Sequence, residues 1–151
     1  MEKVKTIEIL NKLIEINNDR IEGYTTVSEE IEEQDLKTLF IQFVQTSQEF
    51  NQDLSREIYK IGGTPAEGTT KQGNFFRAWM EIKSSIMGAD RIAIQDVCEY
   101  GEDHAVDTYE DVLKNELEYL NIEQLTIIRT QYSLIKNDQF RLKSIRDKMA
   151  V

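Results

Sequence analysis

One short run in the sequence joins the chain's only histidine to carboxylates: Glu102, Asp103 and His104. Imidazole nitrogens and carboxylate oxygens are common metal ligands in proteins, so this run could contribute to a metal site. At about 100° of rotation per residue in a helix, Glu102 and His104 fall on opposite flanks of a stripe centred on Gly101. The alternative is a partly exposed helical histidine. The sequence leaves open whether a weak metal site exists around these three residues.

The other chemically active side chains favour structural roles. Cys98 borders an apolar stripe and is most simply a small buried hydrophobe. No serine or cysteine motif accompanies His104, so nucleophilic catalysis is not indicated. Gly62 and Gly63 end a helix, whereas a phosphate-binding loop begins one. The aromatic residues around Trp79 could form a ligand platform, but such spacing usually serves packing. We therefore predict no catalytic, cofactor-binding or metal-binding residue and interpret the chain as a non-enzyme.

Composition and charge limit the partners that this chain could bind. It has 28 acidic and 18 basic residues among 151, which gives a net charge of −10. Nucleic acids and anionic membranes attract clustered Lys and Arg, so we expect neither as a partner. A hydrophobic fraction of 40% with 30% charged residues is typical of a globular protein. We expect one domain over residues 1–151.

The start of the chain and its single cysteine bear on location. Residues 1–6 lead directly into an amphipathic pattern, without the apolar segment of an export signal. One cysteine cannot form an internal disulfide, so nothing indicates an oxidising compartment. No stretch approaches the roughly 18 apolar residues that span a bilayer. We expect a cytoplasmic protein.

Apolar residues recur at helical spacing over four long stretches, which predicts an all-α fold. We expect long helices over residues 3–33, 35–61, 91–117 and 122–149, and a short helix over residues 75–87. The segment from Gly62 to Pro65 marks the sharpest boundary, because a left-handed glycine and a proline both end helices. Asp35 and Asp90 are the expected N-caps of the second and third long helices.

The lengths of the connections predict how these helices are arranged. Only a few residues join the first long helix to the second, and the third to the fourth, so each pair should form an antiparallel hairpin. The 28 or so residues between the hairpins can carry the chain back along the bundle. We therefore predict an antiparallel four-helix bundle with a short extra helix in the crossover. A plain up-down bundle, with residues 74–87 capping one end, is the alternative.

Several segments carry a family resemblance, in order and over nearly the whole chain. They are residues 13–24 (LIEINNDRIEGY), 61–65 (IGGTP), 79–83 (WMEIK) and 98–105 (CEYGEDHA) followed by Tyr109. Together they resemble an uncharacterised bacterial family of ferritin-like four-helix-bundle proteins. The resemblance implies a ferritin-like fold and leaves the activity open. It also raises the question of a carboxylate-bridged di-metal centre, which can be tested on the residues of this chain.

A di-metal centre of the ferritin-like kind needs inward carboxylates from all four helices and two Glu-x-x-His pairs. The chain contains no Glu-x-x-His, and its nearest counterpart is Glu49-x-x-Gln52. At 100° per residue, Asp19, Glu22, Glu49 and Asp53 fall outside the inner stripes. We expect the inward mid-bundle positions to be polar but uncharged: Asn17, Ser47, Gly101 and Gln139. Such a set suits buried hydrogen bonds that hold the helices in register.

The sequence therefore favours a non-catalytic structural or interaction protein on a ferritin-like scaffold, without a cofactor. A metal-binding protein, active in iron handling or as a di-metal oxidase, is the alternative. Self-association is also expected, as a homo-oligomer. Ile9 and Ile16 lie away from the inner stripe of the first helix, and Ile41 and Tyr59 share an outer flank of the second. We interpret these four residues as an apolar patch between copies.

Overall fold

Four long helices dominate the computed structural model, which describes residues 2–70 and 91–149. In chain order they are α1 (Glu2–Glu30), α2 (Gln34–Lys60), α4 (Arg91–Asn115) and α5 (Ile122–Met149), with the short 3₁₀ helix η1 (Leu117–Tyr119) before α5. All four predicted helices are confirmed to within three residues at each end. The expected short helix over 75–87 and the cap Asp90 lie outside the described residues. None of the described helices combines the length and apolar composition needed to cross a membrane.

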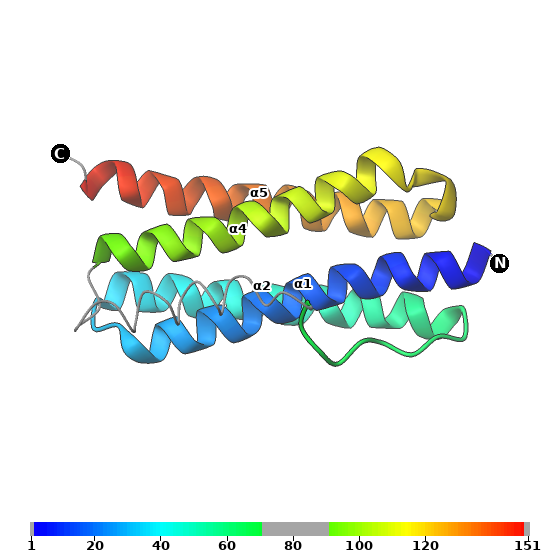
Figure 1. Cartoon of the computed structure of the whole chain (residues 1–151), viewed down its shortest axis with the longest axis horizontal. Helices are drawn as coiled ribbons and strands as arrows, with labels where there is room; N and C mark the ends of the chain where they lie inside the picture. The colour runs from blue at the N-terminus through cyan, green and yellow to red at the C-terminus, as the bar shows by residue number, and fades with distance from the viewer. Residues whose placement is uncertain (1, 71–90, 150–151) are drawn as a thin grey trace.

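The helices form two antiparallel hairpins, α1 with α2 and α4 with α5 (Figure 1). Helix α1 also packs against α4, and α2 against α5. Helix α2 ends at one end of the bundle, whereas α4 begins at the other end (Figure 1). The chain between them therefore runs the length of the bundle, which is the single long crossover of ferritin-like folds. The plain up-down alternative is wrong.

Local sequence explains where the helices begin and end. Gly62 has a φ of +81°, its N–H donates to the carbonyl of Tyr59, and the N–H of Gly63 donates to the carbonyl of Ile58. These two bonds make a Schellman end, as the glycines predicted. The predicted N-cap Asp35 is wrong, because α2 begins one residue earlier at Gln34. Asp35 instead forms an ion pair of 2.8 Å with Arg91 at the start of α4.

The first part of the crossover, residues 61–70, is fastened along α1 by side chains of that helix (Figure 1). The prediction that Asp19 faces solvent is wrong: it is 5% exposed because this segment covers it. Glu22 is exposed, as predicted. The bonds run from Asn11 Nδ2 to Thr64 O (3.1 Å), from Asn18 Nδ2 to Gly68 O (2.8 Å), and from Thr70 N and Oγ1 to the two carboxylate oxygens of Asp19 (3.0 and 2.7 Å).

The apolar core consists of two clusters rather than one continuous interior. One cluster joins the N-terminal half of α1 to the C-terminal half of α2, and the other joins the remaining halves. Between them lies a layer of buried polar and charged side chains from all four helices. Its principal members are Asn17, Arg20, Ser47, Glu102, Tyr109, Gln131 and Asp138.

The expected surface patch on α1 does not exist. Ile9 is 3% and Ile16 is 1% exposed, and both belong to the cluster that contains Val106 and Tyr109 of α4. Because α1 packs against both α2 and α4, its buried face is wider than a single stripe. Ile41 and Tyr59 on α2 are 42% and 66% exposed, in agreement with the prediction.

Gly101 is buried on α4, so a larger side chain there has to displace packed neighbours. We expect Gly101→Leu to lower the free energy of unfolding by about 1–3 kcal/mol through overpacking. Thermal and urea unfolding, followed by circular dichroism, measure the change. At an exposed position the same substitution would raise the unfolding midpoint, because it restores helix propensity. A raised midpoint would contradict the assigned packing of α4.

Candidate functional site

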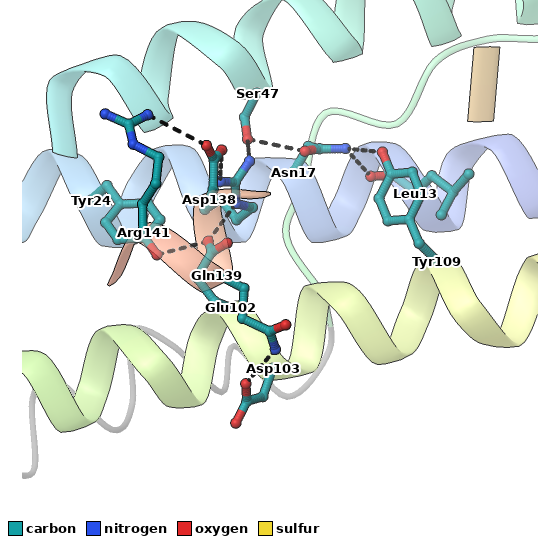
Figure 2. Close-up of polar contacts among 11 residues, drawn as sticks. Leu13, Asn17, Tyr24, Ser47, Glu102, Asp103, Tyr109, Asp138, Gln139 and Arg141 are labelled. Carbon is teal, nitrogen blue, oxygen red and sulfur yellow. Dashed lines mark hydrogen bonds and ion pairs between the residues drawn. The ribbon is translucent and has the colours of Figure 1, made fainter. Parts of the chain in front are cut away.

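Arg20 is the centre of the buried polar layer. It lies on α1, is 1% exposed, and donates hydrogen bonds to one residue on each of the other three helices. Its Nε donates to Glu102 Oε1 on α4 (2.7 Å), its Nη1 to Ser47 Oγ on α2, and its Nη2 to Asp138 Oδ2 on α5 (3.2 Å). Ser47, Glu102 and Asp138 converge from their separate helices in Figure 2. One guanidinium therefore ties the whole bundle together.

An uncharged chain of hydrogen bonds continues from this centre toward one end of the bundle. Ser47 Oγ donates to Asn17 Oδ1 (3.0 Å), and Asn17 Nδ2 donates to the hydroxyl of Tyr109 (2.8 Å), as Figure 2 shows. Tyr109 in turn donates to Gln131 Oε1 (2.6 Å), whose amide donates to the carbonyl of Phe50 (3.2 Å). The predicted role of Asn17 in holding helix register through buried amide bonds agrees with these contacts.

On its other side the guanidinium lies beside aromatic rings. Its Cζ is 5.7 Å from the ring centres of both Tyr24 and Phe43, which is within cation–π range. The Tyr24 hydroxyl donates to Glu102 Oε1 at 2.7 Å. Burial, reinforced by the nearby Glu102, raises the pKa of Tyr24 well above its ordinary value, so the phenol keeps its proton. Burial likewise raises the pKa of Cys98, so its thiol is unreactive.

The buried charges do not balance. Arg20 carries one positive charge, while Glu102 and Asp138 each carry a carboxylate. Burial by itself lowers the pKa of Arg20, whereas the negative charge of Glu102 raises it. The net change is a rise, so the guanidinium stays charged. Burial raises the pKa of Asp138 to about 6, although Arg20 opposes the rise. Within the described part of the chain, Glu102 Oε2 is buried without a hydrogen-bond partner.

The prediction of four inward, uncharged mid-bundle residues is therefore correct for three of them. Asn17, Ser47 and Gly101 are buried as predicted, but the inward residue of α5 is Asp138. Gln139 is half-buried at the flank of α5, where its amide donates to Asp103 Oδ1 at 2.6 Å (Figure 2). The prediction that α5 presents no inward carboxylate is wrong, and so is the prediction that the centre is uncharged.

The run Glu102–His104 does not form one site. Glu102 points inward to Arg20, whereas Asp103 points outward and lies 3.4 Å from Lys143. His104 is half-buried and lies about 100° around the helix from Asp103. Across residues 2–70 and 91–149, no group of three or more His, Cys, Asp or Glu side chains is placed to hold a metal ion. The rotation between neighbouring helical residues explains why these three diverge.

Residues 5–115 match the model of a protein family described as a domain of unknown function, DUF2383. The match covers most of the chain. The chain belongs to this family. The expected membership in an uncharacterised ferritin-like family is thereby confirmed.

The fold of this DUF2383 protein is similar to a solved structure described as ferritin-like, diiron-carboxylate proteins from Bacillus anthracis str. Ames. The two share 16% sequence identity with a TM-score of 0.70, over 96% of this chain and 97% of the other. At that identity the similarity establishes the ferritin-like fold alone. A comparison with curated proteins found no match.

The described residues of this DUF2383 bundle do not fit a carboxylate-bridged di-metal centre. Such a centre needs carboxylates and histidines from four helices, free to bind cations. Here α1 supplies Arg20 and α2 supplies Ser47 at the corresponding depth, and both inward carboxylates already bind the guanidinium. A divalent ion beside Arg20 would face a fixed positive charge at the distance of a direct contact.

Three central residues of the layer were missed from sequence: Arg20, Gln131 and Asp138. Helical spacing did contain a signal for them, because Arg20 follows Asn17 by three residues. On α5 the buried residues Gln124, Ile128, Gln131, Ile135, Asp138 and Leu142 recur every three or four positions. The stripe predicted from sequence shared Ile128, Ile135 and Leu142 with this set. It took Leu125, Tyr132 and Gln139 in place of Gln124, Gln131 and Asp138, which lie one position and about 100° away.

Replacing Arg20 by alanine leaves Glu102 buried without a cation and leaves Asp138 only its longer contact with Arg141, at 3.8 Å. We expect Arg20→Ala to lower the free energy of unfolding by about 3–5 kcal/mol, since breaking a buried ion pair exposes the uncompensated partner. Arg129→Ala, at an exposed position on α5, serves as the matched control and should change stability by less than about 0.5 kcal/mol. Urea unfolding measures both.

Removing the carboxylate charges should recover part of that loss. We expect Arg20→Ala combined with Glu102→Gln and Asp138→Asn to unfold at higher urea than Arg20→Ala alone, because no net charge then remains buried. If Arg20→Ala were as stable as Arg129→Ala, the guanidinium would not hold the bundle together.

Asp138 should make stability depend on pH in an unusual direction. Its pKa of about 6 in the folded state lies above the ordinary value of 3.8, so the folded protein binds the proton more tightly. The unfolding free energy should therefore rise as pH falls from 7 to 5, by about 1 kcal/mol for this group. Urea unfolding of wild type and Asp138→Asn at both pH values isolates the effect. An identical pH dependence in the two proteins would contradict it.

Proposed function

We propose that this DUF2383 protein is a non-catalytic interaction protein: a ferritin-like bundle that acts through its outer surface and associates with itself. The observation that carries this proposal is the position of Arg20, which occupies the middle of the bundle and binds both inward carboxylates. Ferritin-like metal chemistry uses that interior space. Because Arg20 binds these carboxylates, the interior stabilises the fold. We therefore expect the function to depend on the outer surface.

The surface grooves support the same interpretation. A groove of about 380 Å³ between α2 and α5 is lined by Asp35, Gln42, Phe140 and Arg141 among others. Its charged groups are already engaged: Asp35 with Arg91, and Arg141 with Gln42 at 3.1 Å. The groove contains no histidine or cysteine among its described lining residues. The charged side chains of this groove connect neighbouring helices.

Self-association is the second part of the proposal. Several large apolar side chains are strongly exposed on the described surface, including Ile41, Tyr59, Leu134 and Phe140. Exposed apolar residues of this size are enriched where proteins bind one another. The net charge of −10 disfavours nucleic acid and anionic membranes, so a protein, including a second copy, is the partner that fits.

Elemental analysis tests the non-catalytic part. Protein produced with added iron and then dialysed should hold well under one iron per chain, because the carboxylates are bound to Arg20. Glu102→Gln combined with Asp138→Asn should leave the metal content unchanged. Two irons per chain in the wild type, lost in that double variant, would overturn the proposal in favour of a metal-dependent protein.

A further inference from the structure

The outer flank of α2 lacks charge over most of its length. The residues that recur there every three or four positions are Thr38, Ile41, Gln45, Gln48, Gln52 and Ser55. Five of them, all except Ser55, are exposed, and Tyr59 continues the same face one turn beyond Ser55. We call these seven residues the α2 flank. At 1.5 Å per residue, Ile41 and Tyr59 lie about 27 Å apart along the helix.

The α2 flank contrasts with the outer faces of α1 and α4. Charged residues make up 30% of the sequence, and they occupy the outer positions of the neighbouring helices. Helix α1 presents Glu8, Glu22 and Glu29 to solvent, and α4 presents Asp107 and Glu110. Two copies of a chain with a net charge of −10 repel each other wherever such faces meet. An uncharged face allows two copies to approach with less of that cost.

Side-chain hydrogen bonds connect α2 to α1 and to the crossover segment beside the flank. Asn51 Nδ2 donates to Asn18 Oδ1 at 2.8 Å, and Asn18 Nδ2 donates to the carbonyl of Gly68 at 2.8 Å. These bonds place α2, α1 and the crossover segment side by side. Residues 64–70 of that segment contain a single charged residue, Glu67.

The C-terminal part of the α2 flank is also hollowed. A shallow depression there is lined by Gln48, Gln52, Ser55 and Tyr59, together with Asn51 and Arg56. Ile41 projects from the same flank at its other end, 42% exposed. A protruding apolar side chain and a recess on one face make that face complementary to itself when it is reversed.

From these observations we infer that the α2 flank is the contact between two copies of this chain, paired antiparallel about a two-fold axis near Gln48 and Gln52. The inference rests on the proposed self-association and specifies its surface. In this pairing Ile41 of each copy enters the recess beside Tyr59 of the other, because positions 41 and 59 are equidistant from position 50. One helix face with a loop beside it makes a small interface, so the dissociation constant should be about 1–100 μM.

Mass measurements on single variants test the surface. Light scattering of the full chain from 5 to 300 μM should show the mean mass rising with concentration, from that of the 17.6 kDa monomer toward that of a dimer. Ile41→Glu and Tyr59→Lys should each raise the dissociation constant at least tenfold, with helical content retained. Ile122→Glu is the matched control, since Ile122 is 85% exposed at the start of α5 and lies outside the flank. It should leave the dissociation constant unchanged.

A charge swap tests the antiparallel pairing itself. In the combined variant Ile41→Glu with Tyr59→Lys, each glutamate faces a lysine of the other copy, so association should recover at low salt beyond either single variant. No recovery would overturn the antiparallel register. Association that persists in Ile41→Glu and fails in Ile122→Glu would overturn this surface but leave the proposed self-association intact. A monomer at 300 μM would overturn both, while the iron measurement would still test the non-catalytic proposal separately.

Discussion

The guanidinium of Arg20 is the interaction on which the rest of the bundle depends. A charged group this deeply buried is stable only if its partners supply opposite charge and hydrogen bonds in good geometry. Those partners come from three helices: Ser47 on α2, Glu102 on α4 and Asp138 on α5. All four helices must therefore keep a fixed axial register relative to one another. A shift of any helix by one turn, about 5.4 Å, would separate a buried charge from its partner.

This constraint also explains why the apolar core has two parts. On one side of the charged layer, Leu10, Leu54, Val112 and Ile128 pack together, and on the other Tyr24, Phe40, Val97 and Leu142 do so. Apolar side chains alone tolerate many registers, because their contacts are not directional. The polar layer between the clusters selects one of them. The Asn17–Tyr109–Gln131 chain adds directional bonds that extend this selection into the first cluster.

The same layer separates this protein from the chemistry that its fold can support. A ferritin-like bundle is a scaffold, and function depends on the side chains placed in it. Here the inward carboxylates bind a cation that belongs to the chain itself. Their charge is used to hold the helices together. The features that distinguish this chain then lie outside, above all an uncharged helix face on an acidic molecule.

The sequence alone determined the helices and their connections. These depend on neighbours close in the chain: the spacing of apolar residues, the glycines at 62 and 63, and the lengths of the links. Exposure on α2 also followed from that spacing, as Ile41 and Tyr59 show. The length of the middle segment favoured a crossover but left an up-down bundle open. The structure decided between them, because α2 ends at one end of the bundle and α4 begins at the other. Family membership was likewise predicted from short runs of residues.

Only the tertiary structure decided which polar residues face inward. Sequence reasoning placed Asp19 and the carboxylates of α5 outside, because at 100° per residue they fall outside the inner helical stripes. The burial of a charge depends on partners far along the chain, however: Glu102 lies 82 positions from Arg20 in the sequence, and Asp138 lies 118. Likewise, Ile9 and Ile16 are buried and not exposed because α4 packs against α1 in addition to α2. Local spacing describes one helix at a time, whereas the burial of a charge or a flank depends on what the other helices bring to it.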